Sequence, residues 1–209
     1  MRIRWLGHAS FLIELQGGKI LTDPSDEKYG YPVFTEDVDL VTVSHEHQDH
    51  NAVHMLKGNP RVIRGEGIFE WKDIIIRGTS SFHDKNQGKL RGRNTIYKIS
   101  AEGLDLVHLG DLGDILTTDQ LKQIGNVDIL MLPVGGVYTV DAEGAFENMK
   151  LLKPRIIIPM HFKTPHLTID LGPLEAFTSK FDRIVKRPYL DISKDALSAE
   201  PLVIVLDYM

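Results

Sequence analysis

The sequence contains no cysteine in its 209 residues. A disulfide scaffold, a thiolate metal site and a cysteine nucleophile are therefore all excluded. If the chain binds a metal ion, nitrogen and oxygen atoms must hold it. Histidine, of which there are nine, and the carboxylates are the side chains that supply such atoms.

Long apolar runs and strong basic clusters are missing as well. No apolar run approaches the ~18 residues of a membrane span, and the N-terminus passes into a strand-like segment without an apolar signal region. We therefore expect a cytoplasmic protein with no membrane partner. Acidic residues outnumber basic ones by 29 to 24, for a formal net charge of −5, which argues against nucleic acid as a partner.

What the sequence does contain favours a single globular domain over residues 1–209. Its hydrophobic fraction of 42% is ordinary for such a domain. Short apolar runs predict strands at residues 3–6, 11–15, 20–21, 40–43, 61–63, 74–76, 96–99, 104–109, 129–132, 156–158 and 202–206. Helical spacing predicts helices over residues 51–56, 119–124, 141–152 and 173–181. Strands that form a hairpin first and alternate with helices later predict mixed sheets with helices on their outer faces.

The densest chemistry lies in the run His45-Glu46-His47-Gln48-Asp49-His50, directly after an apolar strand. Alternate residues of an extended segment point the same way, so His45 and His47 are placed to hold one ion. Asp49 and His50 turn away toward a second. A solvated polar turn is the alternative, but three imidazoles and a carboxylate packed together repel when charged and need partners when buried.

Three further candidate ligands also follow apolar runs. His83 comes after the run at 74–76, Asp111 after that at 104–109, and His161 after that at 156–158. Ligand sites favour the ends of strands in sheets with crossover helices. Each residue alone is weak evidence, but together with the histidine run they form one coherent set.

At these positions the chain resembles the metallo-β-lactamase superfamily, in particular its small single-domain branch similar to the ascorbate-phosphate lactonases. The resemblance covers nearly the whole chain and depends on an ordered set of motifs: Gly7-His8-Ala9-Ser10-Phe11, Thr22-Asp23-Pro24, HEHQDH, Phe82-His83-Asp84, His108-Leu109-Gly110-Asp111 and Pro159-Met160-His161. It implies a four-layer αββα sandwich.

The same resemblance implies a dinuclear centre. It assigns His45, His47 and His83 to the first metal, Asp49, His50 and His161 to the second, and Asp111 to a bridge. Two such cations can share a water and lower its pKa, which generates hydroxide as a nucleophile. Asp49 would then orient that water or receive its proton. Zinc is the expected metal, with manganese or iron as alternatives.

Residues around the predicted centre have two interpretations each. His8 can bind substrate or shuttle protons, or it can form structural hydrogen bonds. The resemblance implies that Asp23 supports a ligand imidazole through its other ring nitrogen. Lys163 and His166 would hold a substrate anion if their loop lies at the rim, whereas a solvated loop is the alternative. Four other residues are expected to pack, or to support the ligands through hydrogen bonds, rather than to bind metal themselves: His54, His108, Arg91 and Arg93.

The predicted function is therefore hydrolysis of an ester, lactone or phosphoester of a small, anionic metabolite. The basic residues between 85 and 93, which the resemblance places after the third metal histidine, would favour an anionic substrate. The alternatives are a nuclease or phosphodiesterase acting on nucleic acid, and a metal-binding module without turnover. Redox chemistry at a di-iron centre is disfavoured, because the flavin-linked relatives typically carry a carboxylate where this chain has His47.

Overall fold

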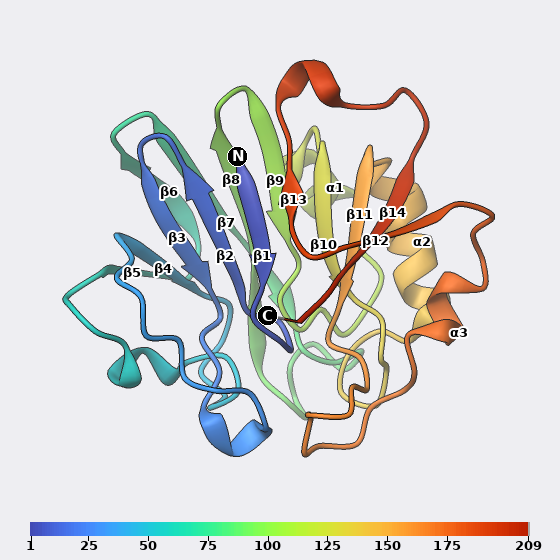
Figure 1. Cartoon of the computed structure of the whole chain (residues 1–209). Coiled ribbons are helices and arrows are strands. Elements are labelled where there is room, and N and C mark those ends of the chain that lie inside the picture. Colours follow the sequence, from blue (N-terminus) through green and yellow to red (C-terminus); the bar gives the residue numbers. More distant parts are fainter. Residues whose placement is uncertain (209) are drawn as a thin grey trace.

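Two β-sheets pack face to face in the computed structural model, which describes residues 1–208 (Figure 1). The first sheet has the strand order β13 (Leu190–Asp191), β1 (Arg2–Trp5), β2 (Phe11–Leu15), β3 (Gly18–Thr22), β4 (Leu40–Val43) and β5 (Arg61–Arg64). Strands β1 to β3 are antiparallel, and β3 to β5 are parallel. The predicted mixed sheet and its hairpin between β2 and β3 are confirmed.

The second sheet is larger and also mixed. Its order is β12 (Ile184–Arg187), β14 (Leu202–Leu206), β11 (Ile156–Met160), β10 (Ile129–Pro133), β9 (Leu104–His108), β8 (Arg93–Ala101), β7 (Ile74–Phe82) and β6 (Gly67–Trp71). Strands β9 to β12 run parallel, and β6 to β9 are antiparallel. One hydrophobic cluster contains inward-facing residues of both sheets, such as Ile13 and Ile99.

The helices are unevenly distributed. α1 (Thr118–Ile124) contacts β7, while α2 (Ala142–Leu152) contacts β10 and the short α3 (Glu175–Thr178), so all three lie against the second sheet (Figure 1). None of these helices is long and apolar enough to cross a membrane, nor is any other helix within residues 1–208. The cytoplasmic location stays a prediction.

The outer face of the first sheet is covered by loops and by the 3-10 turn η2 (Ala52–Met55). Along β3 and β4, Ile20 and Leu40 face the central core, whereas Leu21 and Val41 form a separate cluster on the other side. The sequence predicted a helix at 51–56. Only a single turn forms there, because so short a segment does not repay the cost of nucleating an α-helix.

Candidate metal centre

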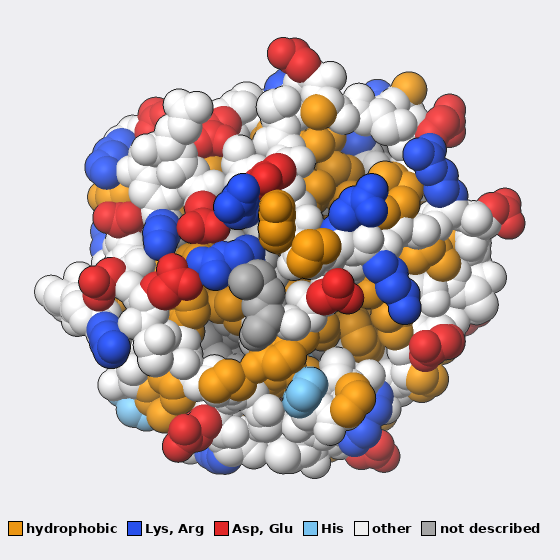
Figure 2. All heavy atoms as spheres, in the orientation of Figure 1, with side chains coloured by type: hydrophobic (Ala, Val, Ile, Leu, Met, Phe, Trp, Pro, Cys, Tyr) orange, Lys and Arg blue, Asp and Glu red, His pale blue; other side chains and the backbone are white. Residues whose placement is uncertain are grey.

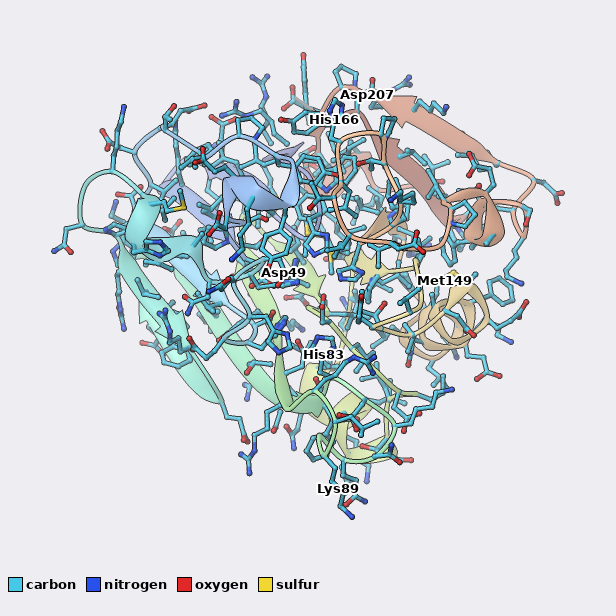
Figure 3. The ribbon with its side chains drawn as sticks, turned by 90° about the horizontal axis from the view of Figure 1, so that it is seen from below. Asp49, His83, Lys89, Met149, His166 and Asp207 are labelled. Atoms are coloured by element: carbon cyan, nitrogen blue, oxygen red, sulfur yellow. The ribbon has the colours of Figure 1, made fainter. Side chains whose placement is uncertain are left out.

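All the predicted ligands lie at the carboxyl ends of strands. His45 to His50 follow β4, His83 follows β7 directly, Asp111 follows β9 and His161 follows β11 directly. Strands β7, β9 and β11 run in the same direction, so their carboxyl ends meet at one edge of the sandwich. Figure 3 looks onto this edge and shows Asp49 and His83 near its centre.

The carboxylate of Asp111 is the centre of the cluster. Its Oδ2 atom lies 3.1 Å from His83 Nε2, 3.2 Å from His161 Nε2, 3.3 Å from His50 Nε2 and 3.9 Å from His45 Nε2. The side chain is 2% exposed. Four imidazoles around one buried carboxylate oxygen have no role in packing a hydrophobic core.

Two groups of ligand atoms lie beside Asp111, and a third group, Asp23 with His45 and His50, shares one histidine with each of them. His45, His47 and His83 form the outer group, and His8, Asp49, His50 and His161 form the inner group. Within each group the ligand atoms lie within 4.8 Å of one another, as the donors around one ion do. All seven residues predicted as ligands are therefore brought together, and His8 joins them.

Hydrogen bonds from behind orient the rings of His50 and His45. Asp23 Oδ2 lies 2.8 Å from His50 Nδ1, and Ser44 Oγ donates to the same oxygen over 2.5 Å. Ser44 Oγ also lies 2.9 Å from His45 Nδ1. If each Nδ1 carries the proton and donates it, both Nε2 lone pairs face Asp111. This is the arrangement that metal-binding imidazoles usually adopt.

Several buried polar atoms of the cluster have no hydrogen-bond partner. They include the Nε2 atoms of His45, His50 and His161 and the second oxygen of Asp111. Unpartnered buried polar groups are costly and rare in folded proteins. Nitrogen and carboxylate donors in this arrangement fit divalent ions, which would satisfy these atoms. The residues present therefore fit a metal centre.

Burial and the neighbouring imidazoles lower the pKa of His8, His45 and His47, which favours their neutral form. Burial lowers the pKa of His45 to about 3 and, together with the neighbouring His161, lowers the pKa of His8 to about 4. His50 is the exception, because Asp111 and Asp49 raise its pKa despite its burial. Neutral imidazoles and ionised carboxylates are the forms that bind metal. These three imidazoles are therefore in their ligating form. The same holds for the carboxylates of Asp49 and Asp111, because neighbouring histidines lower their pKa against the effect of burial.

The backbone around Asp111 is fixed by close packing. Asp111 N–H donates to Asn94 Oδ1 over 3.0 Å, and the preceding Gly110 has a φ of 55°. A Cβ atom on Gly110 would lie 2.3 Å from Asn94 Oδ1 and 2.6 Å from Ser44 Cβ. His108 anchors the same loop, since its Nε2 lies 2.8 Å from Ala9 O and its Nδ1 accepts from Gly110 N–H. The role in packing expected for His108 agrees with these contacts.

His8 is fully buried and lies beside the inner group. Its Nε2 lies 3.2 Å from Asp49 Oδ2, and its ring centroid lies 4.2 Å from that of His161. The carbonyl of His8 accepts hydrogen bonds from His161 N–H and from Trp5 Nε1. Both histidines have a positive φ of 52°, an uncommon conformation for residues other than glycine. The strained backbone therefore holds these two rings against each other.

A cavity of about 500 Å³ opens onto the cluster. Its lining includes His47, Asp49, His83, Asp111 and His161, and also residues not predicted from the sequence: Tyr29, Glu46, Gln48, Arg91, Tyr138 and Ile169. Glu46 and Gln48 belong to the histidine run, whereas Tyr29, Tyr138 and Ile169 come from separate loops that carry no motif. For Arg91, the basic stretch after His83 was the one available signal.

Lys163 and His166, predicted as substrate contacts, do not line this cavity. Lys163 Nζ donates to Ile169 O over 3.1 Å and lies 3.9 Å from Asp170. The His166 ring packs 5.0 Å from that of Tyr208, away from Asp49 and His83 (Figure 3). His54 is exposed on η2, outside the ligand cluster.

Gly135, at the end of β10, makes a close backbone contact beside the cluster. Its N–H donates to His161 O over 3.0 Å, and a Cβ atom would lie 2.3 Å from that oxygen. For Gly135 the contact is with the protein's own backbone, and Gly136 has a φ of 59°.

The profile of the beta-lactamase superfamily domain matches residues 2–161. The chain belongs to this superfamily. It is 38% identical to a crystal structure from Thermotoga maritima that is provisionally described as a Zn-dependent hydrolase of the metallo-beta-lactamase superfamily. That match covers 98% of this chain and 97% of the other, with a TM-score of 0.83. The resemblance to the superfamily and the predicted sandwich fold are confirmed.

Curated relatives agree on the class of enzyme. A metal-dependent hydrolase of Carboxydothermus hydrogenoformans is 29% identical over 205 residues, covering 84% of this chain and 91% of the relative. Another, from Thermoplasma volcanium, is 33% identical over 193 residues, covering 78% and 84%. The expected class, a metal-dependent hydrolase, is confirmed.

Proposed function

We propose that the chain hydrolyses an ester, lactone or phosphoester of a small, anionic metabolite at a dinuclear metal centre. One observation carries this proposal: two groups of ligand atoms flank the carboxylate of Asp111, with unpartnered nitrogens facing it and a cavity opening onto it. The core shared by both sheets supports the prediction that residues 1–209 form a single domain.

Each group is suited to hold one ion. The outer group supplies three imidazoles, and the inner group supplies His50, His161 and Asp49, with Asp111 between the two. When bound, two divalent ions supply Lewis acidity, which lowers the pKa of a water and polarises a substrate oxygen. Zinc is our first choice, with manganese or iron as alternatives, because all three accept this donor set.

Asp49 is the residue best placed to act on the nucleophilic water. Its side chain lines the cavity, while its Oδ2 lies 3.2 Å from His8 Nε2 and 3.6 Å from His50 Nε2. These two histidines lower the pKa of Asp49, although burial opposes them. The carboxylate therefore stays ionised and can accept a hydrogen bond from a water in the cavity. His8 holds Asp49 from the side away from the solvent.

The charge distribution favours a small substrate over nucleic acid. On the face shown in Figure 2, basic side chains are interspersed with acidic ones rather than gathered in a stripe. On that face the mixture offers no continuous basic surface for a phosphate backbone, and the net charge of −5 likewise argues against nucleic acid.

The test combines metal analysis with turnover. The purified protein, a His47→Ala/Asp49→Ala double variant and an Arg93→Met control are analysed by plasma mass spectrometry, then assayed with a panel of lactones, esters and phosphoesters. We expect about two ions per chain in the parent and the control, fewer in the double variant, and turnover that a chelator abolishes and added metal restores. A protein that binds two ions yet cleaves none of the panel would support a metal-binding module. Cleavage of RNA that weakens steeply with salt would favour the nuclease.

A further inference from the structure

Arg91 stands out in the lining of the cavity. Within residues 1–208 it is the only lysine or arginine that lines it. Its guanidinium lies 5.3 Å from the ring centroid of Tyr138, and its Nη2 lies 3.4 Å from Val137 O. Glu46, an acid of the same lining, pairs with Arg64 instead, and no acid among the described residues forms an ion pair with Arg91. A half-buried guanidinium thus lines the cavity without an ion-pair partner among the described residues.

The loop that carries Arg91 is built around the carboxylate of Asp84. This buried side chain accepts hydrogen bonds from four backbone N–H groups, those of Asn86, Gly88, Leu90 and Arg91, over 2.7 to 3.1 Å. Gly92 closes the loop, since its N–H donates to Gly88 O and its carbonyl accepts from His83 N–H. The loop therefore has a defined conformation before any substrate binds.

Among the basic side chains of this loop, only that of Arg91 lines the cavity. Lys89 is exposed and points away from the cluster around Asp49 and His83 (Figure 3). Arg93 is also exposed, at the start of β8, and does not line the cavity. The basic stretch at 85–93 thus contributes one directed charge rather than a diffuse positive patch.

Aromatic and apolar side chains also contribute to the wall of the cavity, beside the polar Glu46 and Gln48. Tyr138 lies under the guanidinium of Arg91, and Tyr29 and Ile169 contribute from two other segments. Those two segments are joined by a hydrogen bond from Thr168 N–H to Tyr29 O. A mostly apolar cavity with a few directed polar groups is typical of a small-molecule site.

We propose that Arg91 binds an oxyanion, a carboxylate or phosphate, that the substrate carries apart from the bond to be cleaved. Tyr138 supports the guanidinium from below, and Asp84 acts as a positioning residue by fixing the loop. A guanidinium matches the geometry of both oxyanions. This inference rests on the proposed function, because it names the substrate class of the same site.

The first experiment compares two esters that differ in one charge. Metal-loaded parent, Arg91→Met, Arg91→Lys and the control Arg93→Met are assayed with 4-nitrophenyl acetate and with the monoanionic mono-4-nitrophenyl succinate. In Arg91→Met we expect the preference for the anionic ester, measured by kcat/KM, to fall about tenfold or more, mainly through KM. For Arg91→Lys we expect a preference between those of the parent and of Arg91→Met. Arg93→Met should keep the parent's preference. An equal fall in Arg93→Met would show that the general field, not Arg91, sets the preference.

The second experiment needs no turnover. Calorimetric titration with benzoate, phenylphosphonate and neutral benzamide measures binding to metal-loaded parent and Arg91→Met, whose metal contents are first shown to be equal. We expect both anions to bind about tenfold more weakly to the variant, and the larger loss tells which oxyanion the site prefers. If neither ester is cleaved, ester hydrolysis fails as a function while this titration still tests Arg91. Unchanged anion affinity would overturn the role of Arg91 alone.

Asp84→Asn tests the positioning role. The substitution keeps one oxygen acceptor and replaces the other by an NH2 group, so whichever way the amide is turned, two of the four backbone hydrogen bonds are lost. We expect a smaller fall in the preference for the anionic ester than in Arg91→Met, again in KM, with metal content retained. Loss of metal with an unchanged preference would mean that Asp84 serves the adjacent His83 rather than Arg91.

Discussion

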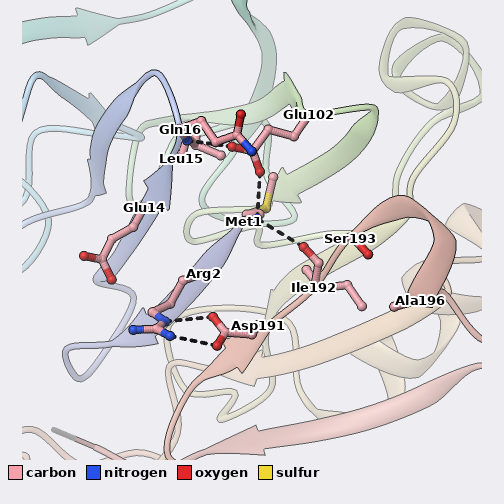
Figure 4. A pocket seen from close by; sticks show the side chains of 10 residues that line it. All are labelled: Met1, Arg2, Glu14, Leu15, Gln16, Glu102, Asp191, Ile192, Ser193 and Ala196. Carbon is pink, nitrogen blue, oxygen red and sulfur yellow. Dashed lines mark hydrogen bonds and ion pairs between the residues drawn. The ribbon is translucent and has the colours of Figure 1, made fainter.

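Two cavities of similar volume lie at opposite ends of the sandwich, and their polar groups differ in kind. The cavity beside Met1, of about 630 Å³, has its charges paired (Figure 4): the amino group of Met1 with Glu102, and the guanidinium of Arg2 with both oxygens of Asp191. The cavity of about 500 Å³ at the metal centre contains buried nitrogens and a carboxylate oxygen without partners.

The comparison shows that buried polar atoms without hydrogen-bond partners, rather than the volume of a cavity, identify the functional one. Paired charges at the surface form a solvated rim that needs no ligand. Buried polar atoms without partners carry a cost that folding alone does not explain, and a bound group removes it. Substitutions at the two ends should therefore have very different effects on metal binding and turnover.

The largest effect is expected at Asp111. Asp111→Ala removes the oxygen that lies between the two ligand groups and leaves four imidazoles facing an empty space. We expect loss of both ions and a fall in turnover of roughly a thousandfold or more, since the metal-activated nucleophile disappears with the ions. Plasma mass spectrometry and kinetics measure the two quantities.

Asp105→Asn is the matched control for Asp111→Ala. Asp105 lies on the same strand, β9, but contacts Ser100 and Lys98 far from the cluster. Its variant should retain both ions. A fully loaded and active Asp111→Ala would refute the bridging role.

A smaller loss is expected at Asp23. Asp23→Asn keeps the shape of the side chain but weakens the acceptor behind His50 Nδ1 and Ser44 Oγ. Loss of such a supporting hydrogen bond typically lowers metal affinity about 10- to 100-fold. Competition with a chromogenic chelator measures this affinity, and the ion held by His50 should be released first. Equal affinity for both ions in parent and variant would contradict the role of Asp23.

Gly110→Ala should act through the backbone. The added Cβ would clash with Asn94 and Ser44, and the positive φ is unfavourable for alanine. We expect a loss of stability of about 1–2 kcal/mol, measured by urea unfolding, together with weaker metal binding because Asp111 is displaced. Gly65→Ala is the control: its φ is also positive, at 76°, but nothing lies within 4 Å of its Cβ position. If both variants bind metal equally, the packing at Gly110 does not position Asp111.

The ligands could be predicted from the sequence because each follows an apolar strand. Strands β4, β9 and β11 are mostly buried and each pairs in parallel with a neighbour, so their apolar runs are easily recognised. Strand β7 pairs antiparallel on both sides but runs in the same direction as β9 and β11, so its carboxyl end lies beside theirs. The edge strands β6 and β12 were missed because their partly exposed faces leave no continuous apolar run. The four-layer sandwich was implied by the resemblance rather than by periodicity, and the strand order within each sheet was not predicted.

The wall of the cavity at the metal centre could not be predicted from the sequence, for a different physical reason. Tyr29, Tyr138 and Ile169 come together only through how their loops close. The position of Arg91 depends on four backbone hydrogen bonds to Asp84, which leave no periodic pattern in the sequence. Lys163 and His166 follow His161 closely in sequence, yet the chain turns them away from the cavity. Proximity in sequence is thus a poor guide to loop geometry.

The smallest effect is expected in the cavity beside Met1. Arg2→Met and Asp191→Asn each break the exposed pair that joins β1 to β13. Both groups are solvated, so their pairing contributes little to stability and nothing to the charge at the metal centre. We expect parent-like metal content and turnover in both variants, measured beside Asp23→Asn as the positive control. If either variant lost metal, paired charges would matter as much as unpaired ones, and the contrast between the two cavities would no longer identify the functional one.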